Sequence, residues 1–179
     1  MKWFFAIFFS FSVIFLSIFG INCIYGNLFP TKYNEEISSS CKEFDVDKAV
    51  IFSLINIESH FNKNALSSKG AVGLMQIIPS TADSLAAELN LSEYDLYDED
   101  DNIKIGTYYV SKLLNRFSNL HVALCAYNAG PTTVSGWLKN EDYSNDGKTL
   151  KNIPYAETKN YILKFEKNFK YYKSKSICK

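Results

Sequence analysis

The sequence predicts a mostly α-helical single domain behind an N-terminal hydrophobic segment, and three observations support this fold class. The length of 179 residues suits one domain of ordinary size and is too short for two well-buried cores. Apolar residues recur at helical spacing in several stretches, and no period-two alternation is long enough for a sheet core. A composition with 47% hydrophobic and 16% aromatic residues excludes a disordered or collagen-like chain.

The N-terminal segment is the most apolar part of the chain. Residues 3–31 carry no charge, and about 20 apolar residues suffice to cross a bilayer. Residues 1–26 are therefore expected to be a signal peptide or a membrane anchor, and the loose match of 17–20 to a cleavage site leaves both open. Pro30 and three consecutive serines make 27–40 an expected linker, which places the folded domain at 41–175.

The helices of this domain are expected from capping residues and apolar spacing. Asp47 is suited to cap a first helix, which continues through Glu58 with apolar residues at helical spacing. Gly130 and Pro131 stop another helix at its C-terminal end. After the first helix, we expect helices at 80–89, 101–117, 121–128 and 155–172.

Charge and cysteine usage name no partner by themselves. Nineteen basic and nineteen acidic residues give no support to nucleic-acid binding. The cysteines and the two histidines lack metal-ligand spacing, so neither a metal nor a cofactor is indicated. In an exported domain Cys41 and Cys178 would be either bridged or free thiols. The charges separate into an acidic stretch, 83–101, and a lysine-rich end, 148–179, which is either a solvated helix face or a contact with an anionic surface.

Glu58 is the candidate for chemistry. On a helix it follows Leu54 by four positions and Ile51 by seven, so it lies on an apolar face. Burial disfavours the charged form of a carboxyl group and raises its pKa, which makes the group a general acid near neutrality. The alternative is a structural glutamate that is hydrogen-bonded or reaches solvent.

Three further blocks of sequence accompany Glu58. Gly70 and Gly73 allow a tight bend, and the amide of Gln76 offers both a donor and an acceptor to a sugar. The blocks Ala-Tyr-Asn-Ala-Gly-Pro at 126–131 and Ile-Pro-Tyr-Ala-Glu-Thr-Lys-Asn-Tyr at 153–161 follow in this order.

Together these blocks resemble the catalytic domain of the soluble lytic transglycosylase family over about 44–169. Glu58-Ser59 resembles the catalytic pair of that family, the block 73–76 its glycine motif, and 101–109 its middle helix. The resemblance implies a lysozyme-like fold, cleavage of bacterial peptidoglycan and no cofactor. Lys159 departs from the family pattern, where arginine is more typical and makes bidentate contacts that lysine does not reproduce.

The resemblance also implies roles for individual residues. Glu58 would protonate the oxygen between N-acetylmuramic acid and N-acetylglucosamine, and its carboxylate would then take the proton of the muramoyl 6-hydroxyl, giving a 1,6-anhydro product. Met75 would form an apolar wall of the cleft. The residues expected to bind substrate are Ser59, Ser67, Gly73, Met75, Gln76, Tyr127, Asn128, Glu157 and Tyr161.

Two other functions remain open from the sequence. A hydrolytic muramidase would cut the same bond with water and needs a second carboxylate, which 93–101 is able to supply. A non-catalytic module would bind the glycan without cutting it. In each case we expect a monomer outside the cytoplasm in a bacterial cell envelope, anchored in the inner membrane or secreted, with peptidoglycan strands as its partner.

Overall fold

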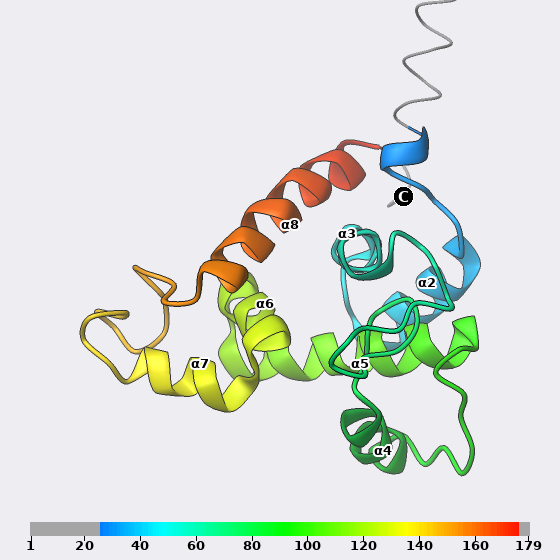
Figure 1. Ribbon diagram of the computed structural model, residues 1–179, viewed down its shortest axis with the longest axis horizontal. Coiled ribbons are helices and arrows are strands. Elements are labelled where there is room, and N and C mark those ends of the chain that lie inside the picture. Colours follow the sequence, from blue (N-terminus) through cyan, green and yellow to red (C-terminus); the bar gives the residue numbers. More distant parts are fainter. Residues whose placement is uncertain (1–25, 176–179) are drawn as a thin grey trace, which may run out of the picture. The chain divides into compact units, whose positions relative to one another are not determined.

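A computed structural model describes residues 26–175 of the chain (Figure 1). The chain divides into two compact units, Met1–Thr31 and Lys32–Lys179, and the second contains all the helices discussed below. The expected signal or anchor at 1–26 lies almost wholly outside the described residues, as does Cys178. Within 26–175 no helix has the length and apolar character needed to cross a bilayer.

The second unit is helical, which confirms the predicted fold class. In its described part, strand-like pairing is limited to isolated bridges between Leu66 and Val72 and between Val72 and Ile77. The helices are α2 (Asn34–Phe44), α3 (Lys48–Ser59), α4 (Pro79–Glu88), α5 (Glu99–Phe117), α6 (Leu120–Ala129), α7 (Pro131–Leu138) and α8 (Ala156–Ser174). All five helices expected from the sequence are present, with ends that differ by one or two residues.

Helix α2 corrects the predicted linker. The segment 27–40 was expected to be a tether, but a helix begins at Asn34 and packs against α5. Ile37 and Cys41 are four residues apart and both are buried, so they form the apolar stripe of this helix. The serines fit because a hydroxyl in a helix can bond the preceding turn, as Ser38 Oγ does to the carbonyl of Asn34.

Helix α7 was not expected from the sequence. Gly130, with a φ of 88°, ends α6 as predicted, but Pro131 then starts a new helix instead of a loop. Proline favours the first position of a helix because that position needs no N–H donor. Val134 and Trp137 of α7 are buried three residues apart, which fixes this short helix on the domain.

Helix α3 lies in the core and carries Glu58 near its C-terminal end. Asp47 caps it as predicted, accepting a 2.9 Å hydrogen bond from the N–H of Ala49. Its residues from 49 to 56 are all buried, and it packs against α2 and α8. The rings of Phe52 and Tyr172 stack with centroids 5.3 Å apart. Helix α5, which runs nearly horizontally in Figure 1, packs against α2, α4 and α6.

Candidate active site

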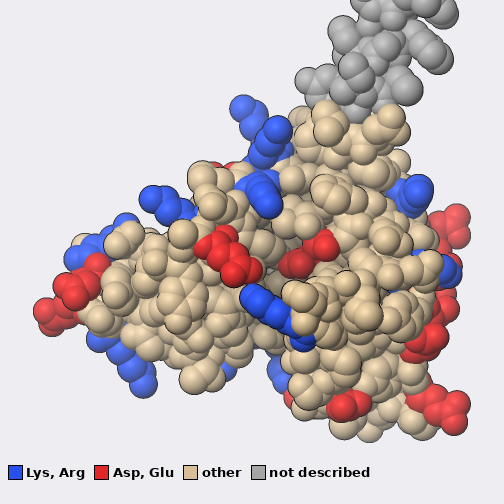
Figure 2. Space-filling model, viewed as in Figure 1, with Lys and Arg blue, Asp and Glu red and all other residues tan. Residues whose placement is uncertain are grey.

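A pocket of about 290 Å³ opens where the end of α3, the loop 60–78, the end of α6 and the first turn of α8 meet. In Figure 2 a hollow near the middle of the visible face is bordered by acidic and basic side chains. The residues that line the pocket are Glu58, Ser67, Lys69, Ala71, Gln76, Ile78, Tyr127, Asn128 and Glu157.

Glu58 is a largely buried carboxyl group in this pocket. Burial raises its pKa from 4.5 to about 7, because the charged form loses hydration. The hydroxyl of Tyr161 donates a 2.6 Å hydrogen bond to Glu58 Oε1, which lowers the pKa but does not offset the burial. Near neutral pH both protonation states of Glu58 are therefore populated.

Two tyrosines surround Glu58 and keep their protons. Burial, followed by the negative charge of Glu58, holds the pKa values of Tyr127 and Tyr161 well above the ordinary value of 10. The hydroxyl of Tyr127 donates to the carbonyl of Met75 at 2.6 Å, while that of Tyr161 donates to Glu58. Both phenols thus serve as hydrogen-bond donors, one to the loop and one to the carboxyl group.

The loop 60–78 is tied to the helices by side chains that the sequence singled out. Ser59 Oγ donates to the carbonyl of Leu74 at 2.8 Å, joining the end of α3 to the loop. Gln76 Nε2 donates to the carbonyls of Gly73 at 2.9 Å and Ala65 at 3.2 Å. The amide nitrogen of Gln76 thus holds the loop while the residue lines the pocket.

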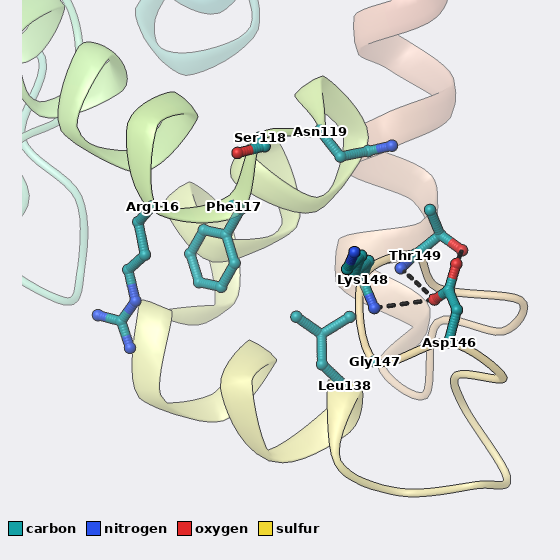
Figure 3. A pocket seen from close by; sticks show the side chains of 9 residues that line it. All are labelled: Arg116, Phe117, Ser118, Asn119, Leu138, Asp146, Gly147, Lys148 and Thr149. Carbon is teal, nitrogen blue, oxygen red and sulfur yellow. Dashed lines mark hydrogen bonds between the residues drawn. The ribbon is translucent and has the colours of Figure 1, made fainter.

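A larger hollow of about 510 Å³ lies elsewhere, at the junction of α5 and α6 and beside the loop after α7 (Figure 3). Its carboxyl group, Asp146, accepts hydrogen bonds from the backbone N–H groups of Lys148 and Thr149 at 2.8 and 2.7 Å. These bonds lower the pKa of Asp146, which leaves it ionised at neutral pH. None of the predicted site residues lines this hollow, so the pocket of Glu58 is the candidate active site.

Comparison with known proteins identifies the family of this chain. The family described as "Transglycosylase SLT domain" matches residues 36–150, which is more than half of the chain. The chain belongs to the transglycosylase SLT domain family. This membership confirms the family resemblance that the sequence motifs indicate.

Individual members of the SLT family are similar over most or part of this chain. The soluble lytic murein transglycosylase of Salmonella typhimurium is 33% identical over 140 residues, 75% of this chain and 22% of that protein. Membrane-bound lytic murein transglycosylase E of Buchnera aphidicola is 38% identical over 93 residues, 49% of this chain and 42% of that protein.

A solved structure supports the same fold. An inactive glutamate-to-glutamine mutant of the lytic transglycosylase Slt from Pseudomonas aeruginosa superposes with a TM-score of 0.76 and 27% identity, covering 87% of this chain and 27% of that one. The chain thus spans about a quarter of the length of these soluble relatives.

The predicted site residues fall into two groups. The pocket brings together Glu58, Ser67, Gln76, Tyr127, Asn128 and Glu157. The other four do not line it: Ser59 bonds to the loop, Tyr161 bonds to Glu58, and Gly73 and Met75 belong to the loop itself. Lys159, the departure from the family pattern, is an exposed residue on α8. Lys69, Ala71 and Ile78 line the pocket and were not predicted.

Met75 corrects one expectation about the SLT site. It was expected to be an apolar wall of the cleft, but its side chain is fully buried. A Cβ added at Gly106 would lie 2.4 Å from Met75 Sδ, so the side chain packs directly on α5. The left-handed turn at Gly73, with φ of 78°, brings the loop down onto this helix.

Asn102 is a structural residue of the site that sequence reasoning missed. Its side chain is fully buried and accepts from the N–H of Met75 at 2.8 Å. It also donates to the carbonyls of Leu96 at 2.8 Å and Val72 at 3.1 Å. The available signal was its spacing, because Asn102 stands four residues before Gly106 on the buried face of α5.

Proposed function

We propose that this chain is a lytic murein transglycosylase, which cleaves the β-1,4 bond between N-acetylmuramic acid and N-acetylglucosamine without water. The observation that carries the proposal is Glu58, a pocket carboxyl group whose pKa is raised to about 7. Relatives named as lytic murein transglycosylases support it. So does the Pseudomonas aeruginosa protein, which is inactive as a glutamate-to-glutamine mutant.

The proposed mechanism uses one carboxyl group twice. Protonated Glu58 donates its proton to the glycosidic oxygen, the C1–O bond breaks, and an oxocarbenium-like state forms on the muramoyl ring. The Glu58 carboxylate is then stabilised by the hydrogen bond from Tyr161. It takes the proton of the muramoyl 6-hydroxyl as that oxygen bonds to C1. The 1,6-anhydro product leaves, and Glu58 is protonated again.

The other predicted residues have supporting roles in this proposal. Tyr161 positions Glu58, while Ser59 and Gly73 shape the loop over it. Ser67 accepts from the N–H of Ala71, which leaves its hydroxyl hydrogen available to a ligand. The residues proposed to contact sugar are Ser67, Gln76, Tyr127, Asn128 and Glu157.

A hydrolytic muramidase is the nearest rival. Its second carboxylate was expected within 93–101, but these residues form the loop before α5 and its first turn, and none lines the pocket. Mass spectrometry of products from purified sacculi separates the two reactions. Anhydro ends are expected, and reducing ends would mean that hydrolysis is correct.

A non-catalytic wall-binding module is the rival from another class. A protein of that class binds sacculi and releases no muropeptides. Release of soluble anhydromuropeptides by the unmodified chain is the expected result, and binding without release would replace the enzyme assignment.

We also propose that the domain acts outside the cytoplasm in a bacterial envelope, as a monomer, delivered by the apolar segment 1–26. The soluble and membrane-bound names of its relatives leave both a cleaved signal and an anchor open. N-terminal sequencing of the mature protein distinguishes them: a new N-terminus near residue 26 means cleavage, and Met1 means an anchor.

A further inference from the structure

Lys69 stands at the tip of a turn whose backbone is fixed on both sides. The N–H of Gly70 donates to the carbonyl of Ser67 at 3.0 Å, which closes the turn around residues 68 and 69. The hydroxyl of Ser67 accepts from the N–H of Ala71 at 2.9 Å, and the backbones of the same two residues bond again at 2.9 Å. A fixed backbone therefore presents a flexible lysine side chain, 77% exposed, at the pocket.

The Lys69 ammonium forms an ion pair with Glu157, in the first turn of α8. The distance from Lys69 Nζ to Glu157 Oε1 is 3.7 Å, and the glutamate side chain is 72% exposed. Exposed ion pairs of this kind contribute only about 0–1 kcal/mol. Both residues line the pocket that contains Glu58, so this pair joins the loop to α8 by a contact that a ligand can displace at little cost.

The charged side chains that line the pocket include one group that attracts an anion. Of the described residues that line it, three have acidic or basic side chains, Glu58, Lys69 and Glu157, while the phenol of Tyr127 keeps its proton. Glu58 is neutral in the state that donates a proton, and Glu157 repels an anion. Lys69 is the cation among them, and it is the group that an incoming carboxylate would meet favourably.

The proposed substrate carries its negative charge at a defined place. N-acetylated sugar rings are neutral, whereas each muramoyl ring bears a 3-O-lactyl arm. This arm ends in its own carboxylate or, through an amide, in a stem peptide with carboxylates. Resting on the proposed function, we propose that Lys69 is a substrate-binding residue that leaves Glu157 and pairs with a carboxylate on the lactyl arm. Glu157 and the substrate then compete for the same ammonium group, and the pocket selects muramoyl strands over neutral sugar polymers.

Binding to three ligands tests this role. The full chain with Glu58→Gln, which separates binding from turnover, is titrated with peptide-bearing glycan strands, with amidase-stripped strands that expose the lactyl carboxylate, and with neutral chitohexaose. Adding Lys69→Met is expected to weaken binding of an anionic ligand by about two- to five-fold, the size of an exposed ion pair, and to leave chitohexaose binding unchanged. A loss with amidase-stripped strands alone assigns the lactyl carboxylate, and a loss with peptide-bearing strands alone assigns the stem peptide. A loss with both anionic ligands means that Lys69 pairs with either carboxylate on the arm.

Two control variants make the result specific to a charge at this place. Lys69→Arg keeps the charge and is expected to bind like the parent. Lys104→Met removes a lysine paired with Glu43 on the surface, away from the pocket, and is also expected to bind like the parent. An equal loss with chitohexaose, an equal loss in Lys104→Met, a loss in Lys69→Arg matching that of Lys69→Met, or no loss at all would overturn the assignment of Lys69.

Turnover of the unmodified chain separates this inference from the proposed function. A protein that cleaves sacculi but binds without regard to Lys69 disproves the inference alone. A protein that binds anionic strands through Lys69 but releases no anhydro products disproves the transglycosylase reaction and keeps the binding site. Failure of the Glu58→Gln chain to bind any of the three ligands overturns the role of Lys69.

Discussion

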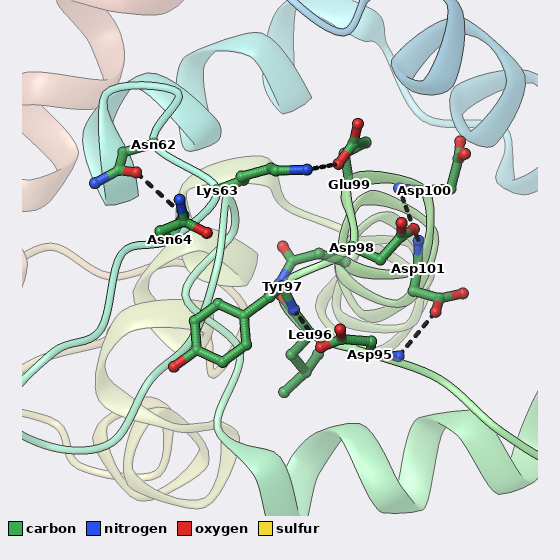
Figure 4. A network of polar contacts seen from close by, with 11 residues as sticks. Asn62, Lys63, Asn64, Asp95, Leu96, Tyr97, Asp98, Glu99, Asp100 and Asp101 are labelled. Atoms are coloured by element: carbon green, nitrogen blue, oxygen red, sulfur yellow. Dashed lines mark hydrogen bonds and ion pairs between the residues drawn. The ribbon is translucent and has the colours of Figure 1, made fainter.

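Glu58 and the carboxylates of residues 95–101 carry the same chemical group, but their surroundings differ. Glu58 is buried, its pKa is raised to about 7, and it accepts a hydrogen bond from Tyr161. In the acidic segment, residues 95–101, the carboxylates are exposed or half-buried, and four of them bond to backbone N–H groups or to a lysine: Asp95, Asp98, Glu99 and Asp101 (Figure 4). Asp98 caps α5 by accepting from two N–H groups, at 3.0 and 3.2 Å, and Glu99 accepts from Lys63 at 2.6 Å.

The difference in hydration decides which of these carboxyl groups is protonated at neutral pH. The hydrogen bond from Lys63 and its positive charge lower the pKa of Glu99, so that residue stays ionised. The acidic segment has more carboxylates but a hydrated environment, and it serves to start α5 and to hold the preceding loop. Loss of water around Glu58, and not the number of nearby acids, creates the candidate general acid.

The largest expected effect is the loss of turnover in Glu58→Gln. Glutamine keeps the shape of the side chain but has no proton to donate, so activity on sacculi is expected to fall by about 10²–10⁴-fold while glycan binding remains. Muropeptide release and sacculus sedimentation measure the two properties. Glu99→Gln is the matched control from the acidic segment and is expected to stay within about two-fold of the parent. Comparable inactivation by Glu99→Gln would move the chemistry to that segment.

Gly73→Ala is expected to disrupt the contact between the pocket loop 60–78 and the acidic segment. Gly73 has a φ of 78°, and a Cβ there would lie 2.2 Å from Asn102 Nδ2 and 2.3 Å from the carbonyl oxygen of Leu96, in the acidic segment. Backbone strain and this clash together should destabilise the fold by about 3 kcal/mol, or lower Tm by about 10 °C.

Gly70→Ala provides the matched control for that contact. Gly70 has a φ of 79° but nothing within 4 Å of an added Cβ, so only strain of about 1–2 kcal/mol is expected. Thermal unfolding of both variants measures the difference. Equal losses of Tm would show that the contact with Asn102 and Leu96 contributes nothing.

The dependence of stability on pH is expected to have opposite signs for Glu58 and for Glu99. Because the folded-state pKa of Glu58 is raised from 4.5 to about 7, the folded chain binds more protons, and stability falls as pH rises through this window. Relative to that of Glu58→Gln, the free energy of unfolding of the parent should fall by about 3 kcal/mol between pH 4.5 and 7.

Glu99 has a lowered pKa, so its contribution is present above the unfolded-state pKa and is lost as pH falls through the folded-state pKa. Relative to Glu99→Gln, the parent should therefore gain stability as pH rises. Urea unfolding checks the sign for Glu99 below pH 4.5 and the sign for Glu58 between pH 4.5 and 7, and parallel curves for the two variants would contradict the assignment.

The smallest expected effect on activity is that of Tyr161→Phe. Its hydroxyl lowers the pKa of Glu58, so its removal should move the loss of activity at high pH to a still higher pH. Turnover is expected to fall by about ten-fold because the carboxylate loses a charge-assisted hydrogen bond. The pH profile of the parent should decline as pH rises through about 7.

Tyr94→Phe is the control for that variant. Its hydroxyl bonds to the carboxylate of Asp83 on the surface, so the same kind of contact is removed away from the pocket. The pH profile of Tyr94→Phe should match that of the parent. A flat parent profile, or the same shift in both variants, would mean that Tyr161 does not tune Glu58.

Local patterns in the sequence predicted most of the fold because helix caps and apolar spacing act over a few residues. As predicted, Asp47 caps α3 and Gly130 ends α6. The spacing of Ile51, Leu54 and Glu58 correctly predicted a shared buried face of α3. The two helices that were missed, α2 and α7, are stabilised by packing of short segments rich in serine and threonine, residues that local propensity assigns to loops.

The site was only partly predictable for a different reason. The burial of Glu58 follows from its own helix, and the family motifs indicated its neighbours in the pocket. The direction in which Met75 points depends on a turn at Gly73 and a gap at Gly106, and the role of Asn102 depends on three backbone groups. Contacts between distant segments do not follow from sequence spacing, which is also why Lys69 was not singled out.

The hydrogen bond between Glu58 and Tyr161 joins residues 103 positions apart, and it has a consequence for synthesis of the protein. The first helix of the pocket leaves the ribosome long before α8, the last helix described. Until α8 has been made and has packed on α3, Glu58 lacks the hydrogen bond from Tyr161 and the pocket lacks the wall that carries Glu157. A chain interrupted before α8 therefore lacks both Tyr161 and Glu157, and with them a complete pocket.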